Sequence, residues 1–211
     1  MGSGCCSGGC HAPTTGASRS FRNALWAALA INAAMFLIEL GAGVAAGSSS
    51  LQADALDFFG DAANYAVSLF VFGMSLRRRA MASMLKGATM GLFGVWVLAN
   101  TGHHLLTGTV PEAAVMGAVG LAALVANVAV AVMLYAFRDG DSNMRSVWIC
   151  SRNDAIGNLA VLAAASGVFT TGAGWPDFAV AGIMAVLALS GAVQILRHAS
   201  TELRAETAAA E

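Results

Sequence analysis

Six long apolar stretches alternate with short polar segments along the chain. Each is close to the ~20 residues that a helix needs to cross the hydrocarbon core of a bilayer. Turn-forming residues, mainly Gly, Ser and Pro, separate several of them. The pattern predicts an all-α membrane protein, a bundle of six transmembrane helices. The predicted spans are 25–46, 51–74, 81–106, 113–137, 147–170 and 178–196.

The segments outside the spans divide the chain into three parts. Residues 1–18 are a Cys-rich stretch of Gly, Ser and Thr that is predicted to be flexible. Residues 19–200 form the predicted transmembrane domain, and residues 201–211 form a short polar tail. We therefore expect no soluble domain after the bundle.

Composition supports a membrane protein and argues against a nucleic-acid partner. Hydrophobic residues make up 57% of the chain and charged residues only 11%, whereas soluble domains carry about 25% charged residues. The surface therefore cannot face water everywhere. The net charge of -1 provides no broad basic face to neutralise phosphates.

Basic residues cluster in alternate loops. They lie before the first span, between the second and third, between the fourth and fifth, and after the sixth. Because cytoplasmic loops are enriched in Lys and Arg, this bias predicts that both termini are cytoplasmic. Arg152 is the one basic residue assigned to a span. The other Lys and Arg residues of the chain are Arg19, Arg22, Arg77, Arg78, Arg79, Lys86, Arg138, Arg145, Arg197 and Arg204.

Two predicted spans each carry a pair of possible metal ligands. Asp57 and Asp61 are four residues apart in the second span, and Cys150 and Asp154 have the same spacing in the fifth. Residues four apart lie on the same face of a helix, and both pairs fall near mid-membrane. Four ligands on two facing helices would make a tetrahedral site, the geometry that zinc prefers.

The donor types suggest which ion such a site would take. A thiolate beside carboxylates shifts preference toward zinc, cadmium and other thiophilic ions. Thiolate and carboxylate must lose their protons to bind metal, so protons and metal compete for the site. This competition is a physical route to proton/metal exchange.

Other polar residues of the spans have alternative interpretations. Asp54 could cap a broken helix or pair with Arg152, and Cys150 could be a small core residue. Glu39 could be a helix-packing contact or a proton-relay group. The adjacent His103 and His104 could assist metal release or simply be solvated.

The first residues of the chain hold a second group of soft donors, which comprises Cys5, Cys6, Cys10 and His11. Close cysteines in a flexible coil are poor disulfide partners, so we expect free thiols. The group could collect metal in the cytoplasm as an accessory site, or it could be dispensable coil.

Residues 49–61 and 150–158 resemble the second and fifth helices of the cation diffusion facilitator family. In that family, an Ala-Asp step precedes a His-or-Asp-x-x-x-Asp pair, and a second such pair is followed by Gly-Asn. The resemblance implies a homodimer that exports divalent metal in exchange for protons, with ligands at Asp57, Asp61, Cys150 and Asp154. Cys150 stands where the family has His or Asp, which makes cadmium a plausible substrate. The family's C-terminal cytoplasmic domain is expected to be missing.

The sequence thus predicts a transporter rather than an enzyme. It would carry Zn²⁺ or Cd²⁺ out of the cell by proton antiport, with no cofactor besides the transported ion. A multi-pass protein of the bacterial inner membrane is the expected setting. Two other functions remain open: a passive cation channel, and a membrane-bound metal sensor or buffer that uses the N-terminal thiols.

Overall fold

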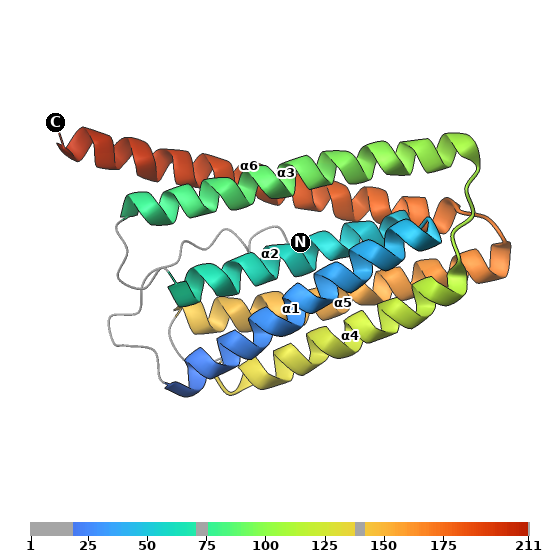
Figure 1. Ribbon diagram of the computed structural model, residues 1–211, viewed down its shortest axis with the longest axis horizontal. Helices are drawn as coiled ribbons and strands as arrows, with labels where there is room; N and C mark the ends of the chain where they lie inside the picture. Colours follow the sequence, from blue (N-terminus) through green and yellow to red (C-terminus); the bar gives the residue numbers. More distant parts are fainter. Residues whose placement is uncertain (1–18, 71–75, 138–141, 211) are drawn as a thin grey trace.

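A computed structural model describes residues 19–70, 76–137 and 142–210. The side chains at 76, 79, 142–153 and 205–210 lie outside this description. The described residues form six helices, as the sequence predicts (Figure 1). They are α1 (Arg19–Ala46), α2 (Ser49–Phe70), α3 (Leu76–Thr107), α4 (Ala113–Tyr135), α5 (Ser142–Thr171) and α6 (Trp175–Ala210).

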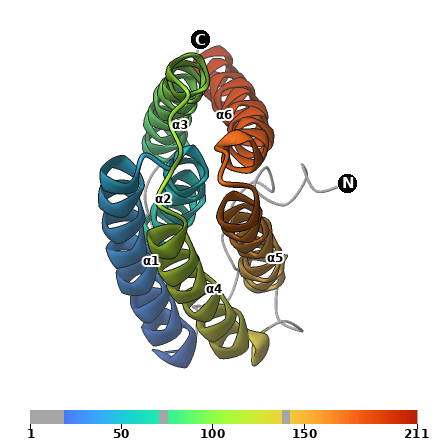
Figure 2. The same cartoon turned by 90° about the vertical axis from the view of Figure 1, so that its right-hand side faces the viewer.

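The helices form two groups. α1, α2, α4 and α5 pack together, and α3 pairs with α6 along one side of them (Figure 2). α2 lies in the middle and contacts each of the other five helices. Its central place explains how a helix with three aspartates fits inside the bundle, because its neighbours shield it from lipid.

The outer faces of the other helices suit a lipid environment. Large apolar side chains such as Leu37, Leu92, Leu106 and Phe169 are exposed. Five described helical segments are long and apolar enough to cross a membrane: Arg19–Ala46, Ala80–Thr107, Ala113–Tyr135, Asp154–Thr171 and Trp175–Arg204. α2 is not among these segments, and it is the helix that carries three aspartates, Asp54, Asp57 and Asp61.

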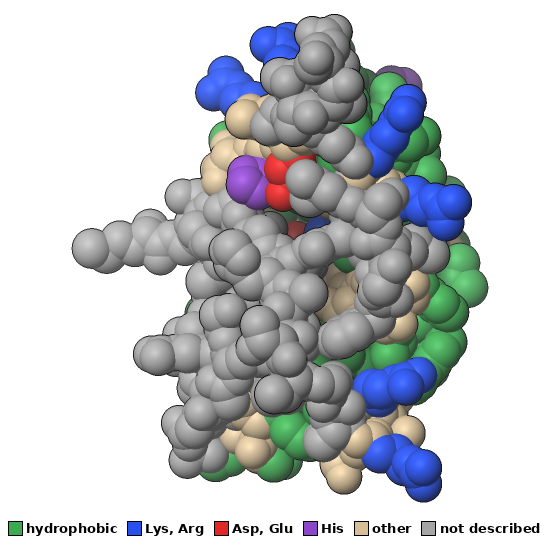
Figure 3. All heavy atoms as spheres, turned by 90° about the vertical axis from the view of Figure 1, so that its left-hand side faces the viewer, with side chains coloured by type: hydrophobic (Ala, Val, Ile, Leu, Met, Phe, Trp, Pro, Cys, Tyr) green, Lys and Arg blue, Asp and Glu red, His purple; other side chains and the backbone are tan. Residues whose placement is uncertain are grey.

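One end of the bundle is basic. α1 and α3 begin there and α6 ends there, so their arginines gather at this end although they are far apart in the sequence (Figure 3). We call it the basic end. That this end faces the cytoplasm stays a prediction. The exposed arginines that mark it are Arg19, Arg22, Arg77, Arg78, Arg197 and Arg204.

The opposite end holds the tight turns. α1 and α5 are each followed by a glycine with positive φ, Gly47 at 66° and Gly172 at 64°. This left-handed conformation ends a helix and strains any residue with a Cβ. It allows α2 and α6 to begin within a few residues of the preceding helix.

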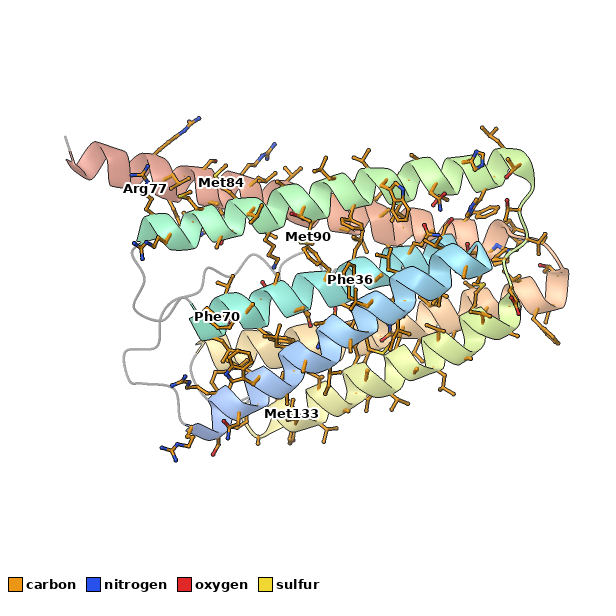
Figure 4. All side chains as sticks on the ribbon, viewed as in Figure 1. Phe36, Phe70, Arg77, Met84, Met90 and Met133 are labelled. Atoms are coloured by element: carbon orange, nitrogen blue, oxygen red, sulfur yellow. The ribbon has the colours of Figure 1, made fainter. Side chains whose placement is uncertain are left out.

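Aromatic and sulfur-containing side chains fill the space between the two helix groups. Phe36 of α1 contacts Phe59 of α2 and Phe93 of α3, with ring centroids 5.4 and 6.2 Å apart. Met90 of α3 packs with Phe59 beside them, and both Phe36 and Met90 lie between α3 and the α1/α2 pair (Figure 4). The layer itself makes apolar contacts, and the two helix groups are also joined by hydrogen bonds from α3 to α2, between Lys86 and Asn64 and between Asn100 and Gln52.

Most helices begin a few residues before their predicted spans, and two differences from the sequence-based interpretation matter for the site and the tail. α3 begins at Leu76. Lys86, which we grouped with the arginines of the preceding loop although the predicted span 81–106 contains it, is part of this helix. It lies in the third turn of α3 with only 8% of its surface exposed. α6 continues to Ala210, through most of the segment assigned to a polar tail.

Candidate metal site

The predicted ligands lie on two helices that face each other. α2 runs toward the basic end and α5 runs away from it, and the two are in contact (Figure 1). Asp61 is twelve residues from the start of α2, which at 1.5 Å per residue is about 18 Å. It therefore lies about halfway along that helix.

Asp61 and Asp154 bring the two helices together. Their carboxyl groups lie within hydrogen-bonding reach of each other, and the Tyr65 hydroxyl donates to Asp61 Oδ2 at 2.9 Å. Asp61 is buried and Asp154 is half-buried. Two carboxyl groups in contact repel each other when both are ionised, so a proton or a cation between them is favoured.

The structure gives less information on the other two predicted ligands, Asp57 and Cys150. Asp57 is half-buried on α2, one turn from Asp61. Cys150 belongs to α5, one turn before Asp154, but its side chain lies outside the described residues. Among the side chains that are described, no three His, Cys, Asp or Glu residues lie close enough to hold a metal ion. The four-ligand set therefore stays a prediction.

A buried lysine adds a positive charge beside this pair. Lys86 of α3 donates a hydrogen bond to Asn64 Oδ1 of α2, and its ammonium acts electrostatically on Asp61. Sequence reasoning missed this contact because Lys86 was grouped with the arginines of the preceding loop. A lysine ten residues into an apolar helix was the signal that could have revealed it.

Asp54 belongs to a second polar group, one turn from Asp57 toward the opposite end. Asn158 of α5 donates to Asp54 Oδ2 at 2.5 Å, and Asn127 of α4 donates to Asn158 Oδ1 at 2.8 Å. Glu39 of α1 lies beside Asp54, close enough to interact. All four side chains are buried.

A family comparison places these helices in a known context. Residues 25–204 match the model of the cation efflux transmembrane domain. The chain belongs to the cation efflux family. No curated protein sequence gives a significant match. The family match covers all six helices, and it identifies the protein as a multi-pass membrane transporter for metal cations, not an enzyme.

In this efflux protein, the start of α2 is fixed by an acid from another helix. Asp177, near the start of α6, accepts hydrogen bonds from Ser48 Oγ at 2.8 Å, Ser49 N at 2.7 Å, Ser50 N at 3.0 Å and Ser50 Oγ at 2.6 Å. Ser48 Oγ also accepts from the amide of Leu51. These bonds satisfy the free amides of the helix terminus, so Asp54 is not the helix cap that one reading of the sequence proposed.

The two adjacent histidines lie at the same end of the efflux protein. His104 Nδ1 is 3.2 Å from Ser49 Oγ, and its ring contacts Phe178. His103 is exposed. This arrangement gives His104 a packing role and leaves its part in metal release untested.

Several predicted residues fall outside what the structure describes. They include the soft donors at Cys5, Cys6, Cys10 and His11, and the Arg152 side chain. Their metal or charge-balancing roles stay predictions. Asn127, by contrast, was missed, although it is the one amide side chain in the very apolar α4.

Proposed function

We propose that this protein exports Zn²⁺ or Cd²⁺ from the cytoplasm in exchange for protons. Asp57, Asp61, Cys150 and Asp154 are the proposed ligands. The contact between the carboxyl groups of Asp61 and Asp154 supports this proposal most directly. It places two acids from facing helices where a proton and a metal ion would compete for the same position.

Transport follows from this competition. With the basic end in the cytoplasm, metal enters from that side and displaces protons from the ligands. The site then opens to the opposite side, and protons from outside release the metal. The two helix groups, separated by the aromatic layer, provide the parts that would move relative to each other, as in carriers with a mid-membrane site.

We further propose a homodimer in the bacterial inner membrane, as the family resemblance implies. Chemical crosslinking in membranes tests the oligomeric state independently of transport. A band at the monomer mass alone, under conditions that crosslink a known dimer, would count against it.

The central test is metal flux into proteoliposomes that contain a pH-sensitive dye. We expect Zn²⁺ or Cd²⁺ uptake to be accompanied by proton release from the vesicles, so that their internal pH rises. Asp57→Ala should abolish both signals. Glu112→Gln is the matched control, because Glu112 is an exposed acid before α4 and should leave the flux unchanged.

Other outcomes point to the two alternative functions. Metal entry without proton movement would favour a channel. Metal binding without entry would favour a sensor or buffer. Deleting residues 1–12 distinguishes a transporter from a buffer. A transporter should keep most of its metal flux, whereas a buffer that uses the N-terminal thiols should lose its metal binding.

A further inference from the structure

The acids at Glu39 and Asp54 form a pair that is separate from the proposed metal ligands. Asp54 lies one turn closer than Asp57, and two turns closer than Asp61, to the turn between α1 and α2. Glu39 is seven residues before the end of α1, or about 10 Å from that turn. The pair therefore lies between the metal site and the end of the bundle opposite the basic end.

The two acids differ in the hydrogen bonds that they accept. Glu39 has none of its surface exposed, and neither of its carboxyl oxygens accepts a hydrogen bond from an amide, hydroxyl or ammonium group in the described part of the chain. Its neighbour is the Asp54 carboxyl group, which it can bond only if one of the two acids carries a proton. Asp54 is 2% exposed, but its carboxyl group accepts a hydrogen bond from the side-chain amide of Asn158. An ionised carboxylate without any donor is very costly in a bilayer interior. Glu39 is thus the acid that carries a proton in this conformation.

The charged groups around the pair favour a bound proton. Among the described residues, the charged groups that act on Glu39 are Asp54 and Asp57, both acidic and both on α2. α4, which also packs against α1, carries no Asp, Glu, Lys, Arg or His between Ala113 and Tyr135. On α5, Asn158 faces Asp54, and Asp154, one turn nearer the basic end, faces Asp61. Lys86 lies toward the other side, near Asp61.

We propose that Glu39 and Asp54 are a proton-binding pair, and that the proton they hold is one of those exchanged for metal. The proposal rests on the proton antiport proposed above. It assigns this proton to two side chains that do not bind the metal. They lie toward the end of the bundle opposite the basic end, from which protons would enter.

Charge repulsion provides the link between the two sites. Without metal, the acids at Asp57, Asp61 and Asp154 favour a proton on the nearby pair. A divalent ion bound among them offsets part of this negative charge, which weakens the repulsion and favours release of the proton from Glu39. After the metal leaves, a proton from the opposite side restores the pair. Each cycle then moves one proton through this pair against one metal ion.

The test compares Glu39→Gln with wild type in metal binding and in coupled flux. Glutamine has the shape of a protonated glutamate and can still donate to Asp54, but it cannot release a proton. We expect the detergent-solubilised protein still to bind Cd²⁺, because the four proposed ligands are intact, but up to about tenfold more weakly, because a side chain that cannot release its proton must oppose metal binding. In proteoliposomes, the number of protons moved per metal ion should fall by about one, and metal flux should respond less steeply to an imposed pH gradient.

Two further variants make the result decisive. Glu39→Asp keeps a titratable acid and should retain proton movement. Asn32→Ala removes another buried polar side chain of α1, two turns before Glu39, and should leave the proton-to-metal ratio unchanged. An unaltered ratio in Glu39→Gln would overturn the proton pair, and so would an equal loss in Asn32→Ala.

Failure of the underlying antiport would look different. In that case, wild type itself would move metal without protons, and the variants could not differ from it in coupling. If Glu39→Gln failed to bind Cd²⁺, we would test Asp54→Asn in its place. The number of protons moved per metal ion should again fall by about one. Loss of binding in both would show that the pair supports the metal site and does not carry the proton.

Discussion

Lys86 of α3 donates a hydrogen bond to Asn64 of α2, and this bond joins the α3/α6 pair to the helix that carries the predicted metal ligands. Asn64 follows Asp61 by less than one turn, so the lysine is held near that carboxyl group. A fixed ammonium beside the site stabilises the carboxylate when no metal is bound. It also repels an incoming cation, which should help the site to release its metal.

Removing this charge should therefore tighten metal binding. In Lys86→Met, the apolar stem is kept but the ammonium is lost. We expect the Cd²⁺ dissociation constant to fall by about fivefold, because a partly screened charge pair contributes roughly 1 kcal/mol. Isothermal titration in detergent measures it. Lys86→Arg keeps the charge and should stay near wild type; equal tightening in both would show that packing, not charge, is responsible.

Cys150 should determine the preference between metals. Cys150→Asp exchanges a soft donor for a hard one, so cadmium transport should fall more than zinc transport. Parallel Zn²⁺ and Cd²⁺ uptake assays in the same vesicles measure the ratio. Equal losses for the two ions would identify Cys150 as a packing residue.

The sequence was enough to predict the six helices and the two i, i+4 pairs, because both depend on local periodicity. The contact between Asp61 and Asp154 followed from the expectation that the second and fifth spans face each other. Contacts between helices without such a signal were missed. Nothing in the spacing of Asp54 shows that Asn158 is its partner, and the burial of Lys86 depends on how α3 packs against α2. These contacts come from tertiary packing, which a single sequence does not encode in any local pattern.

Asp177 should be important for stability although it lies far from the metal ligands. Asp177→Ala would leave two backbone amides and two hydroxyls at the start of α2 without their acceptor. We expect a loss of about 3 kcal/mol and a fall in Tm of roughly 10 °C, measured by thermal unfolding in detergent. Glu112→Ala is the control, since Glu112 lies before α4 without a side-chain cap bond. A Tm for Asp177→Ala equal to that of the control would contradict the role of Asp177.

Gly43 sets how closely α1 approaches α2. A Cβ at this position would lie 2.9 Å from Gln52 Cγ and 3.0 Å from the Gln52 backbone nitrogen, and the Gly43 carbonyl accepts a hydrogen bond from Gln52 Nε2 at 3.1 Å. Gly43→Ala must therefore push the two helices apart. We expect it to destabilise the protein by about 1–3 kcal/mol.

Gly41 provides the comparison on the same helix. A Cβ there meets nothing within 4 Å, so Gly41→Ala should be neutral or stabilise α1 by up to about 1 kcal/mol, the gain in helix propensity. Because both changes are Gly to Ala in one helix, propensity and lost chain entropy cancel between them. The difference in Tm then isolates the close approach of α1 to α2, on which the position of Glu39 beside Asp54 depends. If both variants shifted Tm equally, the two helices would have room that the structure does not show.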